Sequence, residues 1–187
     1  MGIKDLSDTE LISKMKGLDS DDAIYSDVFC QYANELYVRY FSQGYNIARY
    51  YGLRNDDAND AVQNAFIKVL HSINGFNLRK EFKPWFFKIV LNCVRDRYRE
   101  LSRHNHIEID KIEKISNDSF DKFHIKDTLT GIISKQPVKL REVVVLRVYA
   151  DLSFNEISEA LNVSVRQLHN RLNKAYELIR VSLEEGQ

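Results

Sequence analysis

The chain has 187 residues, of which 44% are hydrophobic, a size and composition that suit one or two domains with buried cores. No run of about 18 apolar residues occurs, and the first residues lack the apolar core of a secretion signal, so neither a transmembrane helix nor export is expected. The 27 Lys and Arg residues balance the 27 Asp and Glu residues. We therefore expect a cytoplasmic protein without overall electrostatic bias.

The charges are nevertheless segregated along the chain. Residues 1–60 contain six Lys or Arg against eleven Asp or Glu. Residues 76–103 contain eight against three, and residues 164–180 contain four against one. Two basic segments in an otherwise acidic chain direct a polyanion to particular surfaces and leave other surfaces for a protein partner.

The first half of the chain is expected to be helical, because the sequence has only two prolines and seven glycines. Ser7 and Glu10 have the spacing of a capping box and predict the start of a short helix. A longer helix is expected from about residue 22 to residue 51, with Gly52 as its stop. A third helix begins near Asn55, and its apolar residues recur at helical spacing as far as Ile73.

The outward face of this third helix carries Asp60, Gln63, Asn64, Ile67 and His71. Ile67 is the one apolar member of the group. It is interpreted either as a scattered surface residue or as part of a surface that binds another protein.

A fourth helix is entered through Pro84, which is favourable in a first helical turn. Its buried side is predicted to consist of Phe86, Ile89, Val90, Cys93 and Val94. Another side collects Trp85, Lys88, Asn92, Arg95 and Arg99. Cations along a phosphate backbone, with an aromatic plane for an unstacked base, are typical of single-stranded DNA binding. The alternative is that Trp85 belongs to the core and the arginines are merely solvated.

The two cysteines, Cys30 and Cys93, are far apart and each lies within an apolar helical pattern. This favours two buried, reduced thiols over a disulfide or a zinc site. The five histidines show no regular ligand spacing. The sequence therefore predicts no metal and no cofactor.

Residues 102–127 are polar and show no sustained amphipathic period, so they are the best candidate for a linker. Apolar residues from Leu140 to Val148 predict a further helix beyond it. The fold class expected is all-α, with two small helical domains, residues 1–101 and residues 128–187, joined by a flexible linker over residues 102–127.

Two capping boxes lie close together near the carboxyl end. Ser153 precedes Glu156 by three residues, and Ser164 precedes Gln167 by three. Two helices with such a short corner between them predict a helix-turn-helix.

The second helix of this unit is amphipathic. Val165, Leu168, Leu172, Ala175, Tyr176 and Ile179 are expected to pack inward. The opposite side carries Arg166, Gln167, Asn170, Arg171 and Lys174, whose side chains can read base edges and hold phosphates in a major groove. The alternative is an ordinary solvated helix face.

Four segments together carry a family resemblance. They are the sequence DANDAVQNAF at 57–66, the sequence FKPWFFKIVLN at 82–92, the sequence LREV at 140–143, and the helix-turn-helix. In this order and spacing they resemble the extracytoplasmic-function (ECF) sigma factors of bacterial RNA polymerase, members of the sigma-70 family. The resemblance covers nearly the whole chain.

The resemblance implies three functional surfaces. A docking face of Asp60, Gln63, Asn64 and Ile67 would meet the clamp helices of core RNA polymerase. A −10 surface would capture a flipped base in the loop from Gly75 to Phe82 and hold the melted strand along the fourth helix; it comprises Asn77, Arg79, Lys80, Trp85, Lys88, Asn92, Arg95 and Arg99. A −35 face would read the promoter's −35 element and comprises Arg166, Gln167, Asn170, Arg171 and Lys174. In one departure, Asn64 stands where the family usually has an acidic residue, which puts that polymerase contact in doubt.

We therefore expect a promoter-specificity subunit rather than an enzyme. Its partners would be the β and β′ subunits of core polymerase, promoter DNA and an anti-sigma factor. The rival hypothesis is a transcriptional regulator that uses the same helix-turn-helix to bind an operator without polymerase. A metal-dependent enzyme built on Asp56, Asp57 and Asp60 is disfavoured, because Asp residues at a helix start are already explained by capping and the helix dipole.

Overall fold

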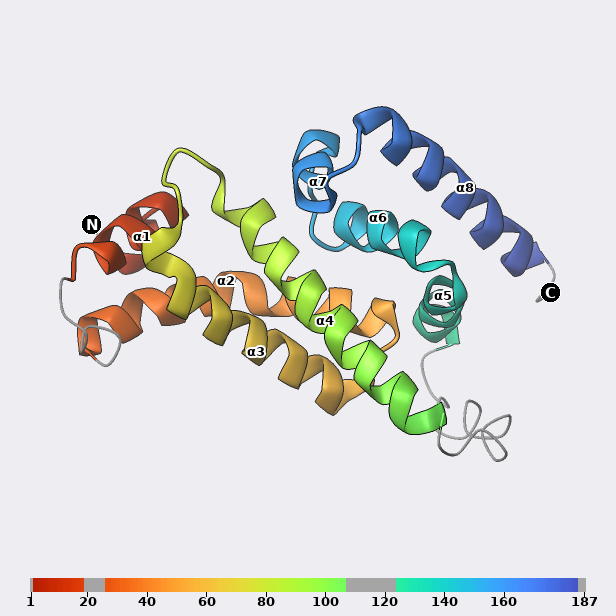
Figure 1. Cartoon of the computed structure of the whole chain (residues 1–187), viewed down its shortest axis with the longest axis horizontal. Coiled ribbons are helices and arrows are strands. Elements are labelled where there is room, and N and C mark those ends of the chain that lie inside the picture. Colours follow the sequence, from red (N-terminus) through yellow and green to blue (C-terminus); the bar gives the residue numbers. More distant parts are fainter. Residues whose placement is uncertain (1, 19–25, 107–123, 185–187) are drawn as a thin grey trace.

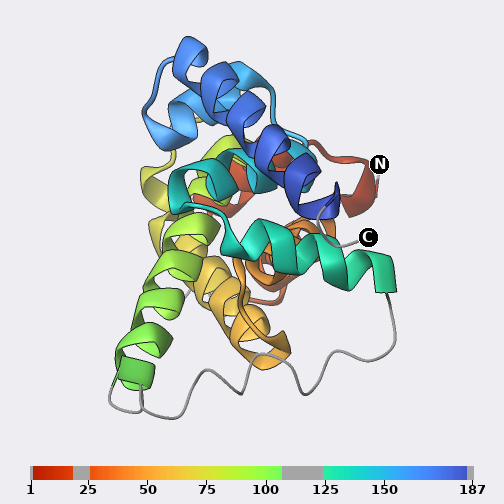
Figure 2. The ribbon, with the colours of Figure 1, turned by 90° about the vertical axis from the view of Figure 1, so that its right-hand side faces the viewer.

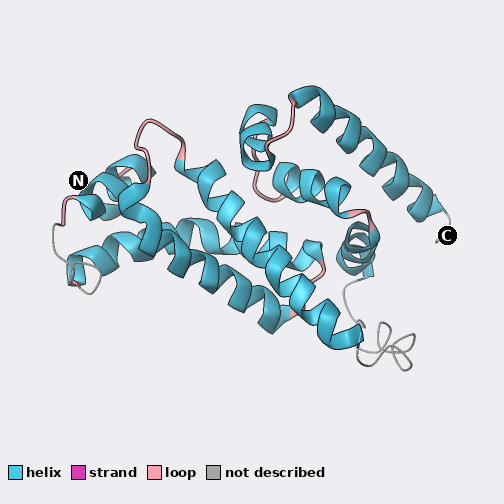
Figure 3. Cartoon of the chain, viewed as in Figure 1, coloured by secondary structure: helices cyan, strands magenta, loops and turns pink. Residues whose placement is uncertain are grey.

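The computed structural model of the chain describes residues 2–18, 26–106 and 124–184. Within these ranges every regular element is a helix and no strand occurs, which confirms the all-α prediction (Figure 3). Two short 3-10 turns, η1 (Ile3–Asp5) and η3 (Ile73–Gly75), accompany the α-helices. The α-helices are α1 (Asp8–Lys16), α2 (Asp27–Tyr51), α3 (Asn55–Ser72), α4 (Phe82–His106), α5 (His124–Lys135), α6 (Val138–Val148), α7 (Phe154–Leu161) and α8 (Val165–Glu184).

The helices form two groups that lie against each other. Helices α1–α4 make an N-terminal bundle in which α2, α3 and α4 pack side by side and α1 lies against α2 (Figure 1). Helices α5–α8 make a C-terminal unit (Figure 2). Helices α5 and α6 contact α2, and α7 contacts α4. We call this contact region between the two groups the seam.

Most predicted helix boundaries agree with the structure, but α2 begins at Asp27, with Ser26 as its N-cap, rather than near residue 22. The Ser7 Oγ accepts from the Glu10 backbone N–H at 3.3 Å, and the Glu10 carboxylate accepts from the Ser7 N–H at 2.7 Å, so the capping box is confirmed. Gly52 ends α2 with a φ of 114°, a conformation that favours glycine. Helix α3 begins at Asn55 as predicted, although its N-cap is Arg54, which makes no side-chain capping bond.

The core of the bundle is built from aromatic rings. Phe86 has no exposed surface, and its ring centroid lies 4.7 Å from Phe66, 5.3 Å from Tyr40 and 5.1 Å from Phe87. Phe87 and Leu91 are also buried, so α4 is covered over a wider arc than the sequence pattern predicts. Helix α4 contacts α7 as well as α2 and α3, and the Phe87 ring lies 5.9 Å from the ring of Tyr40 on α2.

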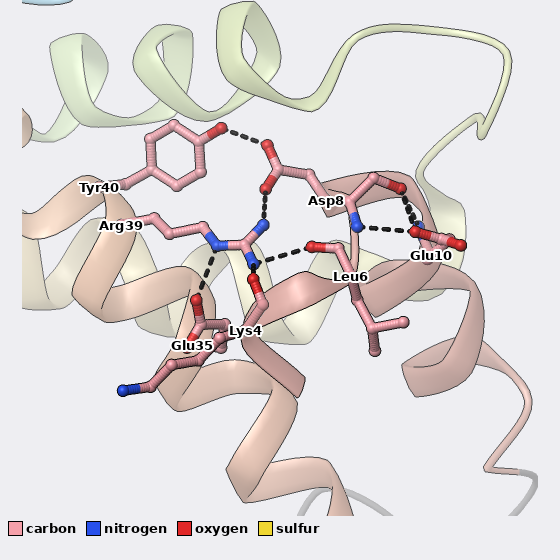
Figure 4. A network of polar contacts seen from close by, with 8 residues as sticks. Lys4, Leu6, Asp8, Glu10, Glu35, Arg39 and Tyr40 are labelled. Carbon is pink, nitrogen blue, oxygen red and sulfur yellow. Dashed lines mark hydrogen bonds and ion pairs between the residues drawn. The ribbon is translucent and has the colours of Figure 1, made fainter. Parts of the chain in front are cut away.

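A polar network fastens α1 to α2 (Figure 4). The Arg39 guanidinium donates to Asp8 and to Glu35, both at 2.9 Å, and to the backbone oxygens of Lys4 and Leu6. The Tyr40 hydroxyl donates to the same Asp8 carboxylate. Burial, with the hydrogen bond to Asp8, raises the pKa of Tyr40, so this hydroxyl remains a donor.

The two thiols differ in burial, and helices reach into the predicted linker. Cys93 is buried, but Cys30 is exposed, so the expectation that both thiols are buried is wrong for Cys30. Cys30 follows Phe29, which takes the inward position in the first turns of α2. Helices α4 and α5 extend into the predicted linker from both ends, whereas residues 107–123, and residues 19–25 before α2, lie outside the described residues.

Candidate nucleic-acid and protein interfaces

The helix-turn-helix has the geometry that its two capping boxes predict. The Ser153 N–H donates to the Glu156 carboxylate at 2.6 Å, and the Glu156 N–H donates to the Ser153 Oγ at 3.3 Å. Ser164 and Gln167 exchange the equivalent bonds at 3.2 and 3.3 Å. Asn162 closes α7 in the left-handed region, with a φ of 53°. These caps fix where α8 begins relative to α7.

Helix α8 turns one side into the C-terminal unit and the other to solvent. Leu168, Leu172 and Ala175 are buried, as predicted. Tyr176 is 47% exposed, so its predicted inward packing is wrong; it lies on the edge of the apolar stripe and lines a surface hollow with Ile179. The −35 face is exposed at every position except Arg171, which is half-buried; the exposed residues are Arg166, Gln167, Asn170 and Lys174.

One member of the −35 face has a second role. The Gln167 side-chain oxygen accepts from the Ser164 N–H, so for another partner the side chain offers mainly its amide nitrogen. Next to it, the His169 ring stacks on Phe154 of α7 with centroids 4.0 Å apart, and the Arg147 guanidinium lies 5.3 Å from the Phe154 ring. This stacking holds the start of α8 against α7 and α6.

The loop before α4 is held in a defined shape. The Lys16 ammonium donates to the Phe76 backbone oxygen at 2.7 Å, and the Asn77 side chain accepts from the Arg79 N–H at 2.9 Å. Trp85 is half-buried, with its ring 4.8 Å from Phe76 and 5.8 Å from Phe82. The ring thus packs partly on the core, as the alternative interpretation expects, while a role in DNA binding stays a prediction.

The cationic side of α4 borders a hollow of about 620 Å³ between α3 and α4. Three members of the −10 surface line it, Asn92, Arg95 and Arg99. Lys88 lies one turn before Asn92 on the helix and is exposed. Lys68 and His71 of α3 line the same hollow, although the sequence analysis did not assign them to this surface. Their position near the end of α3 was visible in the sequence, but the packing of α3 on α4 was not.

The docking face on α3 is open. Asp60, Gln63, Asn64 and Ile67 are all exposed, with Ile67 at 52%. They border a hollow of about 570 Å³ that α4 completes with Asp96, Arg97 and Glu100. Arg97 also donates twice to the Asp57 carboxylate, at 2.9 and 2.7 Å, which ties the start of α3 to α4. The result is a rigid two-helix surface with an apolar residue among polar ones.

The seam brings one residue of the −10 surface into an ion pair. The Arg95 Nε lies 2.6 Å from the Glu142 carboxylate of α6, and the Glu142 side chain is only 6% exposed. The hydrogen bond to Glu142 raises the pKa of Arg95. Sequence reasoning placed Arg95 on a free strand-binding stripe and missed this partner, which is 47 residues away.

Arg141 is the second charged residue of the seam. It is 4% exposed and donates to the backbone oxygens of Tyr51 at 2.6 Å and Gln136 at 3.0 Å. Its guanidinium also lies 4.9 Å from the ring of Tyr51 and 5.3 Å from the ring of Tyr98. Carbonyl oxygens and ring faces thus surround this buried cation.

Metal and membrane chemistry gain no support from the geometry. Among the residues that the structure describes, no group of three or more His, Cys, Asp or Glu side chains is arranged to hold a metal ion. No helix in those same ranges is long and apolar enough to cross a bilayer.

Comparison with known proteins identifies the family. Residues 36–104 match sigma-70 region 2, and residues 128–179 match sigma-70 region 4. The chain belongs to the sigma-70 family, in its ECF group, and is a sigma factor of RNA polymerase. Members of this family direct promoter-specific initiation as DNA-binding transcription regulators, and the rival operator-binding regulator is not favoured.

Individual relatives support the assignment. The RNA polymerase sigma factor SigV of Bacillus subtilis is 30% identical over 140 residues, which span 74% of this chain and 83% of SigV. The ECF sigma factor SigW of the same organism is 25% identical over 181 residues, spanning 88% of this chain and 91% of SigW.

Solved structures share the fold. CnrH, in complex with the cytosolic domain of CnrY, superposes with a TM-score of 0.72 at 23% identity, over 96% of this chain and 99% of CnrH. The sigma factor RpoE of Bartonella quintana, in complex with the anti-sigma factor NepR, gives a TM-score of 0.63 at 15% identity, over 81% of this chain and 96% of RpoE.

Proposed function

We propose that the three surfaces divide the work of promoter recognition. The −35 face of α8 binds the major groove, the loop from Gly75 to Phe82 and the cationic side of α4 hold the melted −10 strand, and the docking face on α3 binds core polymerase. Residues 1–101 and 128–187 act as the two functional domains, and residues 102–127 tether them. The protein works in the cytoplasm, without a cofactor and without catalysing a reaction itself.

The observation that carries this proposal is the two-sided character of α8. Its inner side is locked by buried Leu168, Leu172 and Ala175, while Arg166, Asn170 and Lys174 are exposed. Forked and bidentate donors on a rigidly held helix suit base edges, and the cations suit phosphates. Gln167 contributes through its amide nitrogen, because its oxygen caps the helix.

The −10 surface is extended by Lys68 and His71, because they share the hollow with Asn92, Arg95 and Arg99. Cations on both walls of the hollow would let a strand backbone pass between α3 and α4. The exposed part of half-buried Trp85 would stack on an unstacked base.

An anti-sigma factor is proposed as a further partner. The Bartonella RpoE was solved with the anti-sigma factor NepR and CnrH with the cytosolic domain of CnrY, and this chain shares their fold. A partner of this kind would keep the protein from polymerase until a signal releases it.

Variants of α8 test the −35 assignment. Arg171→Ala in reconstituted holoenzyme is expected to reduce discrimination between the preferred −35 sequence and single-base mismatches by about 1–3 kcal/mol. Arg180→Ala is the matched control, because Arg180 is exposed on the same helix but lies outside the −35 face. Equal discrimination by both variants in competition binding would remove Arg171 from the −35 face.

Variants of Trp85 test the −10 assignment. Trp85→Ala is expected to reduce promoter opening, measured by permanganate reactivity of unpaired thymines, because a stacking platform is lost. Trp85→Phe keeps a ring against Phe76 and Phe82 and is expected to retain most of the opening. Normal melting by Trp85→Ala would end the proposed role of the indole.

A further inference from the structure

The loop from Gly75 to Phe82, which we call the capture loop, is fastened at both ends by buried rings. Phe76 is 4% exposed and Phe82 is 2% exposed, and their ring centroids lie 6.0 Å apart. Residues 77–81 between them are all exposed. The capture loop therefore has an exposed tip on a fixed base, and the direction of the tip is set where the chain leaves Phe76.

The Lys16 side chain contacts the capture loop at that point. Its ammonium donates to the Phe76 backbone oxygen at 2.7 Å, and Lys16 is half-buried. The charge on the donor makes this bond stronger than one between neutral groups. The Phe76 carbonyl lies in the rigid peptide plane that joins Phe76 to Asn77. Holding its oxygen therefore also fixes the direction in which the tip begins.

Other hydrogen bonds shape the tip itself. The Asn77 side-chain oxygen accepts from the Arg79 N–H at 2.9 Å, and the Asn77 backbone oxygen accepts from the Lys80 N–H at 2.9 Å. These bonds form a turn within the capture loop, whereas the Lys16 bond reaches the loop from another helix. The turn gives the tip its shape, and Lys16 sets the orientation of the tip relative to the bundle.

Helix α1 is held firmly enough to support the capture loop. Its inward side is buried and consists of Leu11, Ile12 and Met15. At its first turn, Asp8 accepts hydrogen bonds from Arg39 and Tyr40 of α2. Lys16 is the last residue of α1, and α1 contacts η3, where the capture loop begins (Figure 1). The ammonium is thus presented from a helix end whose position is fixed.

We propose that Lys16 is a positioning residue for promoter opening. Through the Phe76 carbonyl it holds the capture loop in the orientation that receives the flipped −10 base. This inference rests on the proposed function of the loop and assigns a role to α1, which lies outside the three functional surfaces. A loop that already has its binding orientation loses less conformational freedom when the base binds, so the base is held more tightly.

Trp85 reports on the capture loop in the free chain. It is the single tryptophan of the sequence, and its ring lies 4.8 Å from the ring of Phe76. Lys16→Met removes the ammonium and keeps an unbranched side chain. We expect Phe76 to loosen and the quenching of Trp85 fluorescence by acrylamide to increase about twofold. Quenching of Lys16→Met at the wild-type level would overturn the proposal.

Promoter opening by the reconstituted holoenzyme tests the consequence for DNA. The templates are a promoter selected from a randomised library and copies with an abasic site at each nontemplate −10 position in turn. The captured position is the one whose abasic site slows opening by the wild type most. On the intact promoter, Lys16→Met should open about fivefold more slowly in permanganate time courses, because fewer loops are ready for the base. With the abasic site at the captured position, Lys16→Met and the wild type should open equally.

Two matched variants control for charge and for folding. Lys14→Met removes the same charge from an exposed position of the same helix and should behave as the wild type on both templates. Lys16→Arg keeps a cationic donor and should restore both the opening rate and the quenching of Trp85. If Lys16→Met slows opening by the same factor on the intact and the abasic templates, the defect is a general loss of stability and the positioning role is rejected.

The same templates separate this inference from the proposed function. A wild type that opens every abasic template as fast as the intact promoter would reject base capture by the loop, and the role of Lys16 with it. A wild type that distinguishes the templates, beside a Lys16→Met variant that opens both as the wild type does, would reject the role of Lys16 alone.

Discussion

The interior of the N-terminal bundle and the seam are built from different chemistry. The bundle interior joins α2, α3 and α4 through rings such as Tyr40, Phe66 and Phe86. At the seam, buried apolar residues continue across from one half to the other and the Tyr50 and Tyr149 rings stack, but Arg95, Glu142 and Arg141 add an ion pair and buried hydrogen bonds.

We expect the packing of the bundle interior to be permanent and the contacts at the seam to be reversible. Water offers no equivalent partner for ring packing, so this packing persists as long as the bundle stays folded. Hydrogen bonds and ion pairs exchange with water, salt or phosphate at a small net cost. We therefore expect the bundle to survive conditions and substitutions that open the seam.

Phe86→Ala tests the interior of the N-terminal bundle and should lower the free energy of unfolding more than the other substitutions. Phe86 is fully buried among four rings, so its truncation should lower the free energy of unfolding by about 3–5 kcal/mol. Urea unfolding followed by circular dichroism measures it. Val38→Ala, at a position of α2 that is 65% exposed, should change stability by less than about 0.5 kcal/mol. A similar small loss for Phe86→Ala would contradict the account of the core.

Arg141→Met tests the seam side. Removing the guanidinium leaves the Tyr51 and Gln136 oxygens without this donor, at a cost of about 1–3 kcal/mol. The helical content should persist while the radius of gyration in small-angle X-ray scattering increases. Lys139→Met, at an exposed position of the same helix, should leave the scattering unchanged. Unchanged scattering in Arg141→Met as well would show that the seam does not depend on this cation.

Arg39→Met tests the polar network that joins α1 to α2 inside the bundle. The loss of four hydrogen bonds should release α1 locally and lower stability by about 1–2 kcal/mol. Amide hydrogen exchange should accelerate in α1 but not in α6. Lys14→Gln, an exposed substitution in α1, serves as the control. Faster exchange throughout α6 would show that the two networks are coupled.

Thiol reactivity perturbs the chain least and shows directly whether the interior of the bundle is closed to solvent. Cys30 is exposed and should react quickly with Ellman's reagent, whereas Cys93 should react slowly because it is buried and burial raises its pKa. Because the pKa of Cys93 is raised, its reaction should accelerate only at a pH above the usual range for a thiol. Phe86→Ala should expose Cys93 and accelerate its reaction. Equal rates for both thiols in the wild type would contradict the buried position of Cys93.

Local features of the sequence predicted local structure well. The capping boxes at Ser7, Ser153 and Ser164 depend on residues three apart, and all three form the predicted hydrogen bonds. Helical spacing also identified the buried side of α8 as far as Ala175. It was wrong at Tyr176, because the period does not reveal how far neighbouring helices cover an element.

Features that depend on the placement of distant helices were not predictable. The sequence marks Arg95 as one cation in a stripe, and nothing near it announces Glu142 of α6. Lys68 and His71 line the α4 hollow because of how α3 packs on α4, and the sequence does not reveal that packing. The additional burial of Phe87 and Leu91 likewise depends on how other helices pack against α4. The roles assigned to the −35 face, the −10 surface and the docking face stay predictions until variants are measured.

The most direct test of the account is transcription by purified core RNA polymerase with this chain added, on a supercoiled library of randomised promoters. We expect RNA start sites that appear only with the chain and share two conserved elements at a fixed spacing. The −35 element should lose its conservation when Arg171→Ala replaces the wild type. Polymerase that gains no new start sites on adding the chain would contradict the central claim.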